Sequence, residues 1–256
     1  MFRVVVPARF ASTRLSGKVL MPLAGKPMLQ WVYERARASA AAEVLIATDD
    51  ERVASAARAF GAPVMMTAAA HASGTDRIAE VARRAGWGES DIVVNLQGDE
   101  PLMPSALINQ VSELLTARPR AAIATLAGPI QSIEEFADPR IVKVVTAADG
   151  RALYFSRAAI PWDRDAWGTA PAAPALSAAA RRHIGLYAYR VGGLRRFASL
   201  PPSRLELIEK LEQLRALENG LEIVVADACA PPGADVNTAE DLERVARQLT
   251  CGGEKS

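Results

Sequence analysis

The first half of the chain alternates short apolar runs with amphipathic stretches. The apolar runs are rich in β-branched residues and fall at residues 3–6, 44–47, 63–66 and 91–97. The intervening stretches carry apolar residues at helical spacing, at residues 28–39, 50–60 and 74–85 and in a segment that begins at Pro104. This alternation is typical of βαβ units, whose parallel strands are buried on both faces. We therefore predict an α/β fold with a doubly wound, mostly parallel sheet.

The pattern changes after Leu115. Short strand-like runs follow with few long helices between them, at residues 122–126, 141–146, 153–156 and 184–189. They predict mixed or antiparallel pairing in a smaller inserted lobe. We expect a single domain over residues 1–256, with a core from residues 1–120 and 200–250 and a lobe from residues 121–199.

The last third of the chain carries a loop and three further elements. Residues 168–180 are rich in Ala and Pro and lack periodicity, which predicts a mobile loop. The apolar spacing then predicts one long helix over residues 204–219, ended by Gly220. A strand at residues 222–228 precedes a final helix that starts at Thr238, where Asp241 completes a capping box. The six terminal residues are expected to be frayed.

The composition narrows the classes of function. The chain has 256 residues, of which half are apolar, and a formal net charge of +1. A protein of this size is large enough for a substantial core. Because it is nearly neutral, its overall charge gives no general electrostatic attraction to nucleic acid. No apolar stretch reaches the roughly eighteen residues that a membrane span requires, and the chain begins with a strand pattern rather than an export signal. Two cysteines form no disulfide framework, so we expect a cytoplasmic protein.

The loop after the first strand gathers positive charge. Five cations and no acid precede Glu34, and three of them, Arg9, Arg14 and Lys18, follow the first strand among small residues such as Ala8. In a doubly wound sheet, ligands bind beyond the carboxyl ends of the strands. The loop therefore favours a bound triphosphate, held by backbone N–H groups and charge-assisted hydrogen bonds. It matches neither common phosphate-binding glycine motif, and a solvated basic loop is the alternative.

Carboxylates follow two of the predicted strands. The central strand runs into Gly98, and Asp99 and Glu100 come directly after it. Magnesium binds through one or two carboxylates together with substrate phosphates, so Asp99 is a sensible metal ligand. Asp235 stands between the last strand and the last helix. Ordinary acidic turns are the alternative for both positions.

Polar residues lie on one face of a strand in the second half. The two-residue period places His183, Tyr187 and Tyr189 together. Such a face is compatible with solvent, with a contact between subunits or with a ligand. Arg157 and Arg164 upstream are suited to holding a carboxylate.

Glu212 is expected inside the apolar arc of the predicted helix 204–219, between Leu205 and Ile208. A charge in that place needs a partner, either at a subunit contact or in a site.

An ordered set of motifs spans nearly the whole chain. It comprises PARFASTRLSGK, GKPMLQWVYERA, ATDDERV, HASGTDRIAEV, VVNLQGDEP, KVV, LYFSRAAIPWDR, RHIGLYAYR, LEQLRALENG and NTAEDLERV. This set resembles the 3-deoxy-manno-octulosonate cytidylyltransferase (CMP-Kdo synthetase) family. The resemblance implies a nucleotide-diphospho-sugar transferase-like fold with a dimerisation lobe.

The resemblance also implies a reaction and its residues. The expected enzyme joins CTP to the eight-carbon acid sugar Kdo with Mg²⁺, releases pyrophosphate and acts as a homodimer in lipopolysaccharide synthesis. The resemblance assigns catalytic roles to Arg14, Lys18 and Asp99. The nucleotide would lie at Ala8, Arg9, Arg14, Lys18, Ser73, Thr75 and Arg77. The sugar would be bound by Gln97, Arg157, Arg164, His183, Tyr187, Glu212 and Gln213. The metal ligands are expected among Asp99, Asp235 and Asn237.

Two positions depart from the family pattern. The family has L-P-G-K where this chain has Ser16 in LSGK, and it has V-D-T where this chain has Asn237 in DVNT. An amide carries no formal charge, so Asp235 or Asn237 remains open as the second metal ligand. The alternatives for function are a cytidylyltransferase for 8-amino-Kdo or sialate, and a CTP-binding regulator without turnover.

Overall fold

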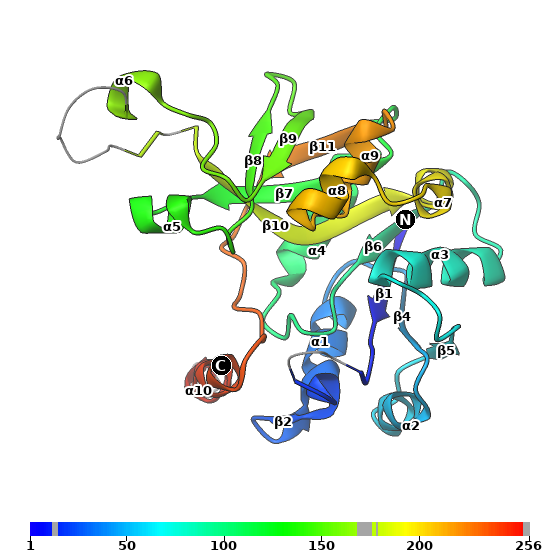
Figure 1. Cartoon of the computed structure of the whole chain (residues 1–256). Coiled ribbons are helices and arrows are strands. Elements are labelled where there is room, and N and C mark those ends of the chain that lie inside the picture. Colours follow the sequence, from blue (N-terminus) through cyan, green and yellow to red (C-terminus); the bar gives the residue numbers. More distant parts are fainter. Residues whose placement is uncertain (12–14, 168–175, 178, 253–256) are drawn as a thin grey trace.

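A single central sheet organises the chain in the computed structural model, which describes residues 1–11, 15–167, 176–177 and 179–252. Seven strands cross it from one edge to the other (Figure 1): β11 (Ile223–Asp227), β7 (Ile123–Pro129), β10 (Arg181–Arg190), β6 (Ile92–Asn95), β1 (Phe2–Pro7), β4 (Glu43–Thr48) and β5 (Val64–Met66). Two more strands, β8 (Lys143–Thr146) and β9 (Ala152–Ser156), continue from β10.

Parallel pairing dominates, as predicted. Strand β1 pairs in parallel with β4 and β6, β4 with β5, and β11 with β7. Strand β10 is antiparallel to both of its neighbours, β6 and β7. The strands of residues 121–199 therefore join the same sheet as those of the first half. The proposed division into core and lobe stays a prediction.

Helices cover both faces of the sheet, because residues of the strands alternate between two apolar clusters. Val4 and Val6 pack with residues of α1 (Met28–Arg37), α2 (Glu51–Ala59) and α4 (Ser105–Thr116). Val5 packs on the opposite face with α3 (Gly74–Arg84), α7 (Val191–Ser199) and α9 (Gln213–Glu218). All three valines are fully buried, and each such side chain contributes about 1.5–3 kcal/mol of transfer free energy.

Several short elements complete the fold and were not predicted from the pattern. They are η1 (Lys18–Leu20), β2 (Pro22–Leu23), β3 (Lys26–Pro27), α5 (Ile133–Ala137), α6 (Arg164–Trp167) and α7. The final helix, α10 (Ala239–Gly252), begins as predicted, since Thr238 Oγ1 accepts from Asp241 N at 3.2 Å and Asp241 Oδ2 accepts from Thr238 N at 2.9 Å. No described helix combines the length and the apolarity that crossing a membrane takes.

The predicted long helix over residues 204–219 is wrong. The chain forms α8 (Arg204–Glu209) and then α9, separated by Lys210 in the left-handed region with φ of 54°. The break turns Leu211 into the core while Ile208 stays 67% exposed. Glu212 consequently stands at the residue before α9 and does not lie within one continuous apolar arc.

Candidate active site

A charge pair connects the first loop with the segment after β6. Gly17 has a left-handed φ of 69° that turns the chain into η1. Lys18 Nζ then donates to Asp99 Oδ2 at 2.7 Å and to Val236 O at 2.8 Å. A lysine has three N–H donors, and within the described part of the chain the third has no protein acceptor. This contact places Asp99 against the loop that follows β1.

Acidic and amide side chains gather around this pair. Val236 N donates to Asp99 O at 3.0 Å, which places Asp235 and Asn237 on either side of the connection. Asn237 Nδ2 donates to Asp235 Oδ2 at 2.5 Å. Burial, together with the negative charges of Asp99 and Asp235, raises the pKa of Glu100 to about 8. The segments after β6 and β11 therefore bring several carboxyl groups to one place.

This cluster fits Mg²⁺ as a partial site. Its donors are carboxylate oxygens, the hard ligands that the ion prefers, and Mg²⁺ usually keeps waters and takes substrate phosphates beside one or two carboxylates. Among the described residues, no three His, Cys, Asp or Glu side chains are arranged to hold a metal alone. Asp99 and Asp235 carry charge. The Asn237 amide is turned toward Asp235 as a donor, so Asp235 is the better second ligand.

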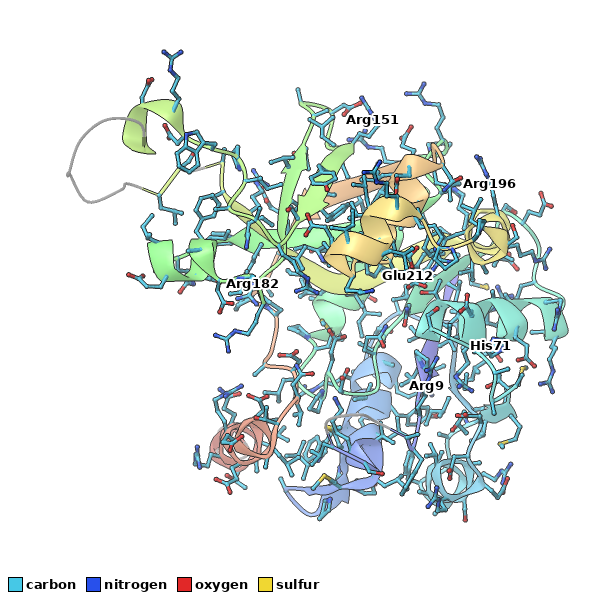
Figure 2. All side chains as sticks on the ribbon, viewed as in Figure 1. Arg9, His71, Arg151, Arg182, Arg196 and Glu212 are labelled. Atoms are coloured by element: carbon cyan, nitrogen blue, oxygen red, sulfur yellow. The ribbon has the colours of Figure 1, made fainter. Side chains whose placement is uncertain are left out.

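The predicted nucleotide residue Arg9 is held by the segment before α3. Arg9 Nη2 donates to His71 O at 2.8 Å, and Figure 2 shows the two residues side by side. His71 Nε2 lies 2.5 Å from Glu80 Oε2. Burial opposes ionisation of Glu80, but hydrogen bonds from the Ala68 amide, His71 and Arg84 outweigh it and lower its pKa to about 2. A charged Glu80 thus holds the segment that positions Arg9.

The start of α3 connects the predicted nucleotide and sugar residues. Ser73 caps the helix through a capping box with Asp76. Thr75 Oγ1 donates to Glu212 Oε2 at 2.8 Å. Arg77, in contrast, is fully buried and lies against Thr67 and Asp49, with its Nη2 3.2 Å from Asp49 Oδ1. Its guanidinium joins α3 to the end of β4, and its contact with a nucleotide stays a prediction.

Four predicted sugar residues line one narrow cavity of about 80 Å³. They are Gln97, Tyr187, Glu212 and Gln213, which come from the segment after β6, from β10 and from α9. Asn95, Thr75 and Tyr189 complete its polar wall. Burial raises the pKa of Glu212. The cavity is therefore rich in groups that form hydrogen bonds with hydroxyls.

A larger cavity, of about 890 Å³, holds two more of the predicted residues, Arg157 and His183, together with Glu100 and Asp235. Arg157 is fixed there because its Nε donates to Glu209 O at 2.7 Å and its Nη1 to Pro139 O at 2.9 Å.

The two cavities adjoin through aromatic contacts. The rings of His183 and Tyr187 have centroids 5.2 Å apart, and Tyr187 stacks on Tyr189 at 5.8 Å. The predicted common face of these three residues is therefore confirmed.

One predicted sugar residue is not brought to these cavities. Arg164 is exposed on α6, in an arm that extends away from the sheet (Figure 1), and it lines neither cavity. Arg164 and Arg157 therefore do not lie together at one site for a carboxylate. Arg14 lies outside the described residues, as does most of the predicted loop over residues 168–180.

Two residues that contact the predicted sugar residues were not identified from the sequence. Arg215 is 7% exposed, and its Nη2 donates to Glu206 Oε1 at 3.0 Å and to Glu212 Oε1 at 3.1 Å. Thr125 is fully buried beside His183. Neither residue stands in a recognisable spacing, and each is identified only by the contacts that the fold creates.

Comparisons with known proteins identify the family. A model of the cytidylyltransferase family matches residues 3–223. The chain is 55% identical over 253 residues to the 3-deoxy-manno-octulosonate cytidylyltransferase of Cellvibrio japonicus, with 98% of this chain and 99% of that protein covered. It is 51% identical over 249 residues to the enzyme of that name from Methylococcus capsulatus, with 97% of each covered.

Solved structures give the same picture. The structure of CMP:2-keto-3-deoxy-manno-octonic acid synthetase complexed with CTP is similar with a TM-score of 0.89 and 40% identity, over 98% of this chain and 100% of that one. A cytidylyltransferase from Leptospira borgpetersenii, 18% identical with a TM-score of 0.62 over 97% of this chain and 86% of that one, shares the fold. Because both the family model and the relatives extend along most of its length, the chain belongs to the 3-deoxy-manno-octulosonate cytidylyltransferase family.

Proposed function

We propose that this protein transfers CMP from CTP to the anomeric hydroxyl of Kdo and releases pyrophosphate. The observation that carries the proposal is the Lys18–Asp99 contact of 2.7 Å, which puts a phosphate-binding cation beside a metal-binding carboxylate. The relatives support it, because those named above are 3-deoxy-manno-octulosonate cytidylyltransferases and a similar solved structure contains CTP.

The nucleotide side of the site neutralises and positions phosphates. Lys18 is held by Asp99 and by Val236 O, and its remaining N–H serves the triphosphate. Arg9 is oriented by its hydrogen bond to the His71 carbonyl. Phosphoryl-type transfer needs in-line positioning and neutralisation of spreading charge more than a protein nucleophile. Fixed cations provide both, at little cost in reorganisation.

Asp99 and Asp235 are the residues that would hold Mg²⁺, which supplies charge neutralisation and a lowered pKa for the attacking hydroxyl. Burial and the charges of Asp99 and Asp235 raise the pKa of Glu100 to about 8, so Glu100 is mostly protonated at neutral pH and adds little negative charge beside them. The negative charge that attracts a cation at this point comes from Asp99 and Asp235. The metal requirement is part of the proposal.

The sugar side binds and orients the acceptor. Polar groups of Gln97, Tyr187 and Gln213 face the narrow cavity, and Arg157 and His183 face the larger one. A carboxylate of the sugar is attracted to Arg157, whose position is fixed by two backbone carbonyls. Hydroxyl groups then fit the narrow cavity. This arrangement directs the anomeric hydroxyl toward the α-phosphorus.

Assembly and location belong to the same proposal. Leu207 and Ile208 of α8 are 54% and 67% exposed, and large apolar side chains exposed at adjacent positions favour contact with a second copy of the chain. We propose a homodimer that works in the cytoplasm and supplies an activated acid sugar for lipopolysaccharide synthesis.

Pyrophosphate release tests the reaction. The purified protein is incubated with CTP, Mg²⁺ and, in turn, Kdo, 8-amino-Kdo or sialate, and the assay is repeated with the other nucleoside triphosphates. The proposal expects the highest kcat/KM for Kdo with CTP. A preference for sialate, or CTP binding without turnover for any sugar, would overturn it.

Asp99→Asn examines the metal-binding carboxylate. We expect a folded protein that has lost at least about a hundred-fold in kcat, because the cation ligand is gone. Asp149→Asn is the matched control, since Asp149 is an exposed turn residue, and it should keep full activity. Substantial Mg²⁺-dependent turnover in Asp99→Asn would contradict the assigned role.

A further inference from the structure

A buried hydroxyl lies at the point where β10 changes its register. Thr125 of β7 is fully buried. The pairing shifts between Ile184 and Tyr187, so that β10 contains two more residues than the strand opposite. Thr125 Oγ1 lies 3.0 Å from Ile184 O, 2.8 Å from Leu186 O and 3.0 Å from His183 Nε2. One hydroxyl therefore meets three polar atoms of the same irregular segment.

Counting hydrogens decides the direction of these contacts. A threonine hydroxyl has one hydrogen and two lone pairs. The carbonyls of Ile184 and Leu186 can only accept, so the hydrogen of Thr125 goes to one of them. If His183 Nε2 were unprotonated, three acceptors would compete for that one hydrogen, and buried unpaired acceptors are costly. The contact is satisfied only when His183 Nε2–H donates to Thr125 Oγ1.

The surroundings keep the imidazole neutral. The edge of Phe155 lies against the His183 ring with centroids 5.1 Å apart, and Tyr187 lies at 5.2 Å. Burial lowers the pKa of His183 to about 3. At neutral pH the ring therefore carries a single N–H, at Nε2, and Nδ1 keeps a lone pair. Within the described residues, the hydrogen bond of the ring to protein is made through Nε2.

The ring belongs to the wall of the larger cavity. His183 lines it with Glu100 and Arg157. Its backbone is fixed as well, since His183 N donates to Val142 O at 2.8 Å. The imidazole thus has a fixed place, a fixed charge and a fixed tautomer.

We propose that Thr125 is a positioning residue that holds His183 as the Nε2–H tautomer, so that Nδ1 is presented as a hydrogen-bond acceptor for a hydroxyl group of the acid sugar. The tautomer follows from the contacts above, and the acceptor role rests on the proposed function. An acceptor at this point binds a hydroxyl and rejects a carboxylate, while the positive charge of Arg157 on the same cavity attracts a carboxylate. His183 and Arg157 together therefore determine the orientation in which the sugar binds.

Nitrogen NMR reads the tautomer directly. The chain has two histidines, and a His183→Gln variant assigns the signals of a ¹⁵N-labelled sample. In the wild type near neutral pH we expect a pyrrole-type Nε2 and a pyridine-type Nδ1 for His183. In Thr125→Val the preference for Nε2–H should weaken, and Thr125→Ser should restore it. A wild-type signal with the proton on Nδ1 would overturn the proposal, whether or not the variants fold.

Kinetics tests the acceptor role. For Thr125→Val we expect KM for Kdo to rise roughly ten-fold, with KM for CTP unchanged and with recovery in Thr125→Ser. Thr116→Val, which removes an exposed threonine hydroxyl from α4, is the control and should change neither. An unchanged KM for Kdo in Thr125→Val would refute the acceptor role. A wild type that makes no CMP-Kdo would count against the proposed function, and the NMR result would still decide the tautomer.

Discussion

Thr75 Oγ1 donates a 2.8 Å hydrogen bond to Glu212 Oε2, across 137 residues of chain. Thr75 lies in the first turn of α3, beside the predicted nucleotide site, and Glu212 directly precedes α9 and lines the predicted sugar cavity. Glu212 also accepts from Arg215 Nη2 at 3.1 Å, and Arg215 is itself held by Glu206. The two substrate sites therefore share one hydrogen-bonded connection.

Thr75→Val should loosen this connection without changing the shape of the side chain. The Glu212 carboxylate loses one of its donors inside a buried cavity, which costs about 1–2 kcal/mol of unfolding free energy. We expect KM for the sugar to rise several-fold, while the Thr116→Val control keeps both stability and kinetics. Urea unfolding and initial rates at varied sugar measure the two effects. Unchanged values for both would show that the contact carries no function.

Glu80→Gln should reveal a pH-dependent contribution to stability. The pKa of Glu80 is lowered to about 2 from the ordinary value of 4.5, because hydrogen bonds to its carboxylate outweigh the effect of burial. A lowered carboxyl pKa stabilises the folded state above the unfolded pKa, and the contribution is lost as the pH falls through the folded pKa. We expect the variant to lose up to about 3 kcal/mol at pH 7, with the difference from the wild type shrinking from about pH 4.5 downward.

The same variant links stability to nucleotide binding. Glu80 holds His71, whose carbonyl orients Arg9. KM for CTP should therefore rise more than KM for the sugar. Glu51→Gln is the control, because Glu51 forms an exposed pair with Arg58, and such pairs contribute little. A difference from the wild type that stays constant from neutral to acid pH would contradict the assignment.

Lys143→Met should deform the larger cavity. Lys143 is fully buried, and its Nζ donates to the carbonyls of Asp138, Ile141 and Arg157 at 2.9, 2.6 and 2.7 Å. Removing the ammonium leaves three carbonyls without this donor, which costs roughly 2–4 kcal/mol. Thermal unfolding and KM for the sugar should both change. Lys26→Met, at a half-exposed ion pair with Glu34, should change neither, and equal effects in the two variants would refute the argument.

Much of the fold follows from local pattern. The apolar runs of the first half become parallel strands because each is followed by a helix that returns the chain to the same side. The capping box of Thr238 and Asp241 depends on neighbouring residues alone, and it forms as expected. Lys18 and Asp99 could each be identified as candidates from the sequence because each follows a strand of one parallel sheet, and their direct contact is a result of the fold.

Other features depend on contacts that no local pattern reveals. Residues 204–219 carry helical spacing, yet α8 ends at Glu209 and Lys210 takes a left-handed φ of 54°. Glu209 has partners far away in the sequence, since its Oε1 accepts from Ser156 Oγ of β9 at 2.6 Å and its Oε2 accepts from Arg157 N, directly after β9, at 2.9 Å. The extra residues in β10 are held by Thr125, which looks like an ordinary strand residue. Sequence spacing predicts which face of a helix or strand is buried. The end of α8 and the extra residues in β10, in contrast, are associated with contacts to residues far away in the sequence.

Lys18 and Asp99 are the residues that we assign to hold the triphosphate and its metal. The most direct test is a crystal structure with CTP and Mn²⁺, in which anomalous scattering locates the ion. We predict a peak within bonding distance of the Asp99 carboxylate, with the triphosphate against Lys18 and Arg9. A nucleotide bound elsewhere, or an ion away from Asp99, would contradict the account.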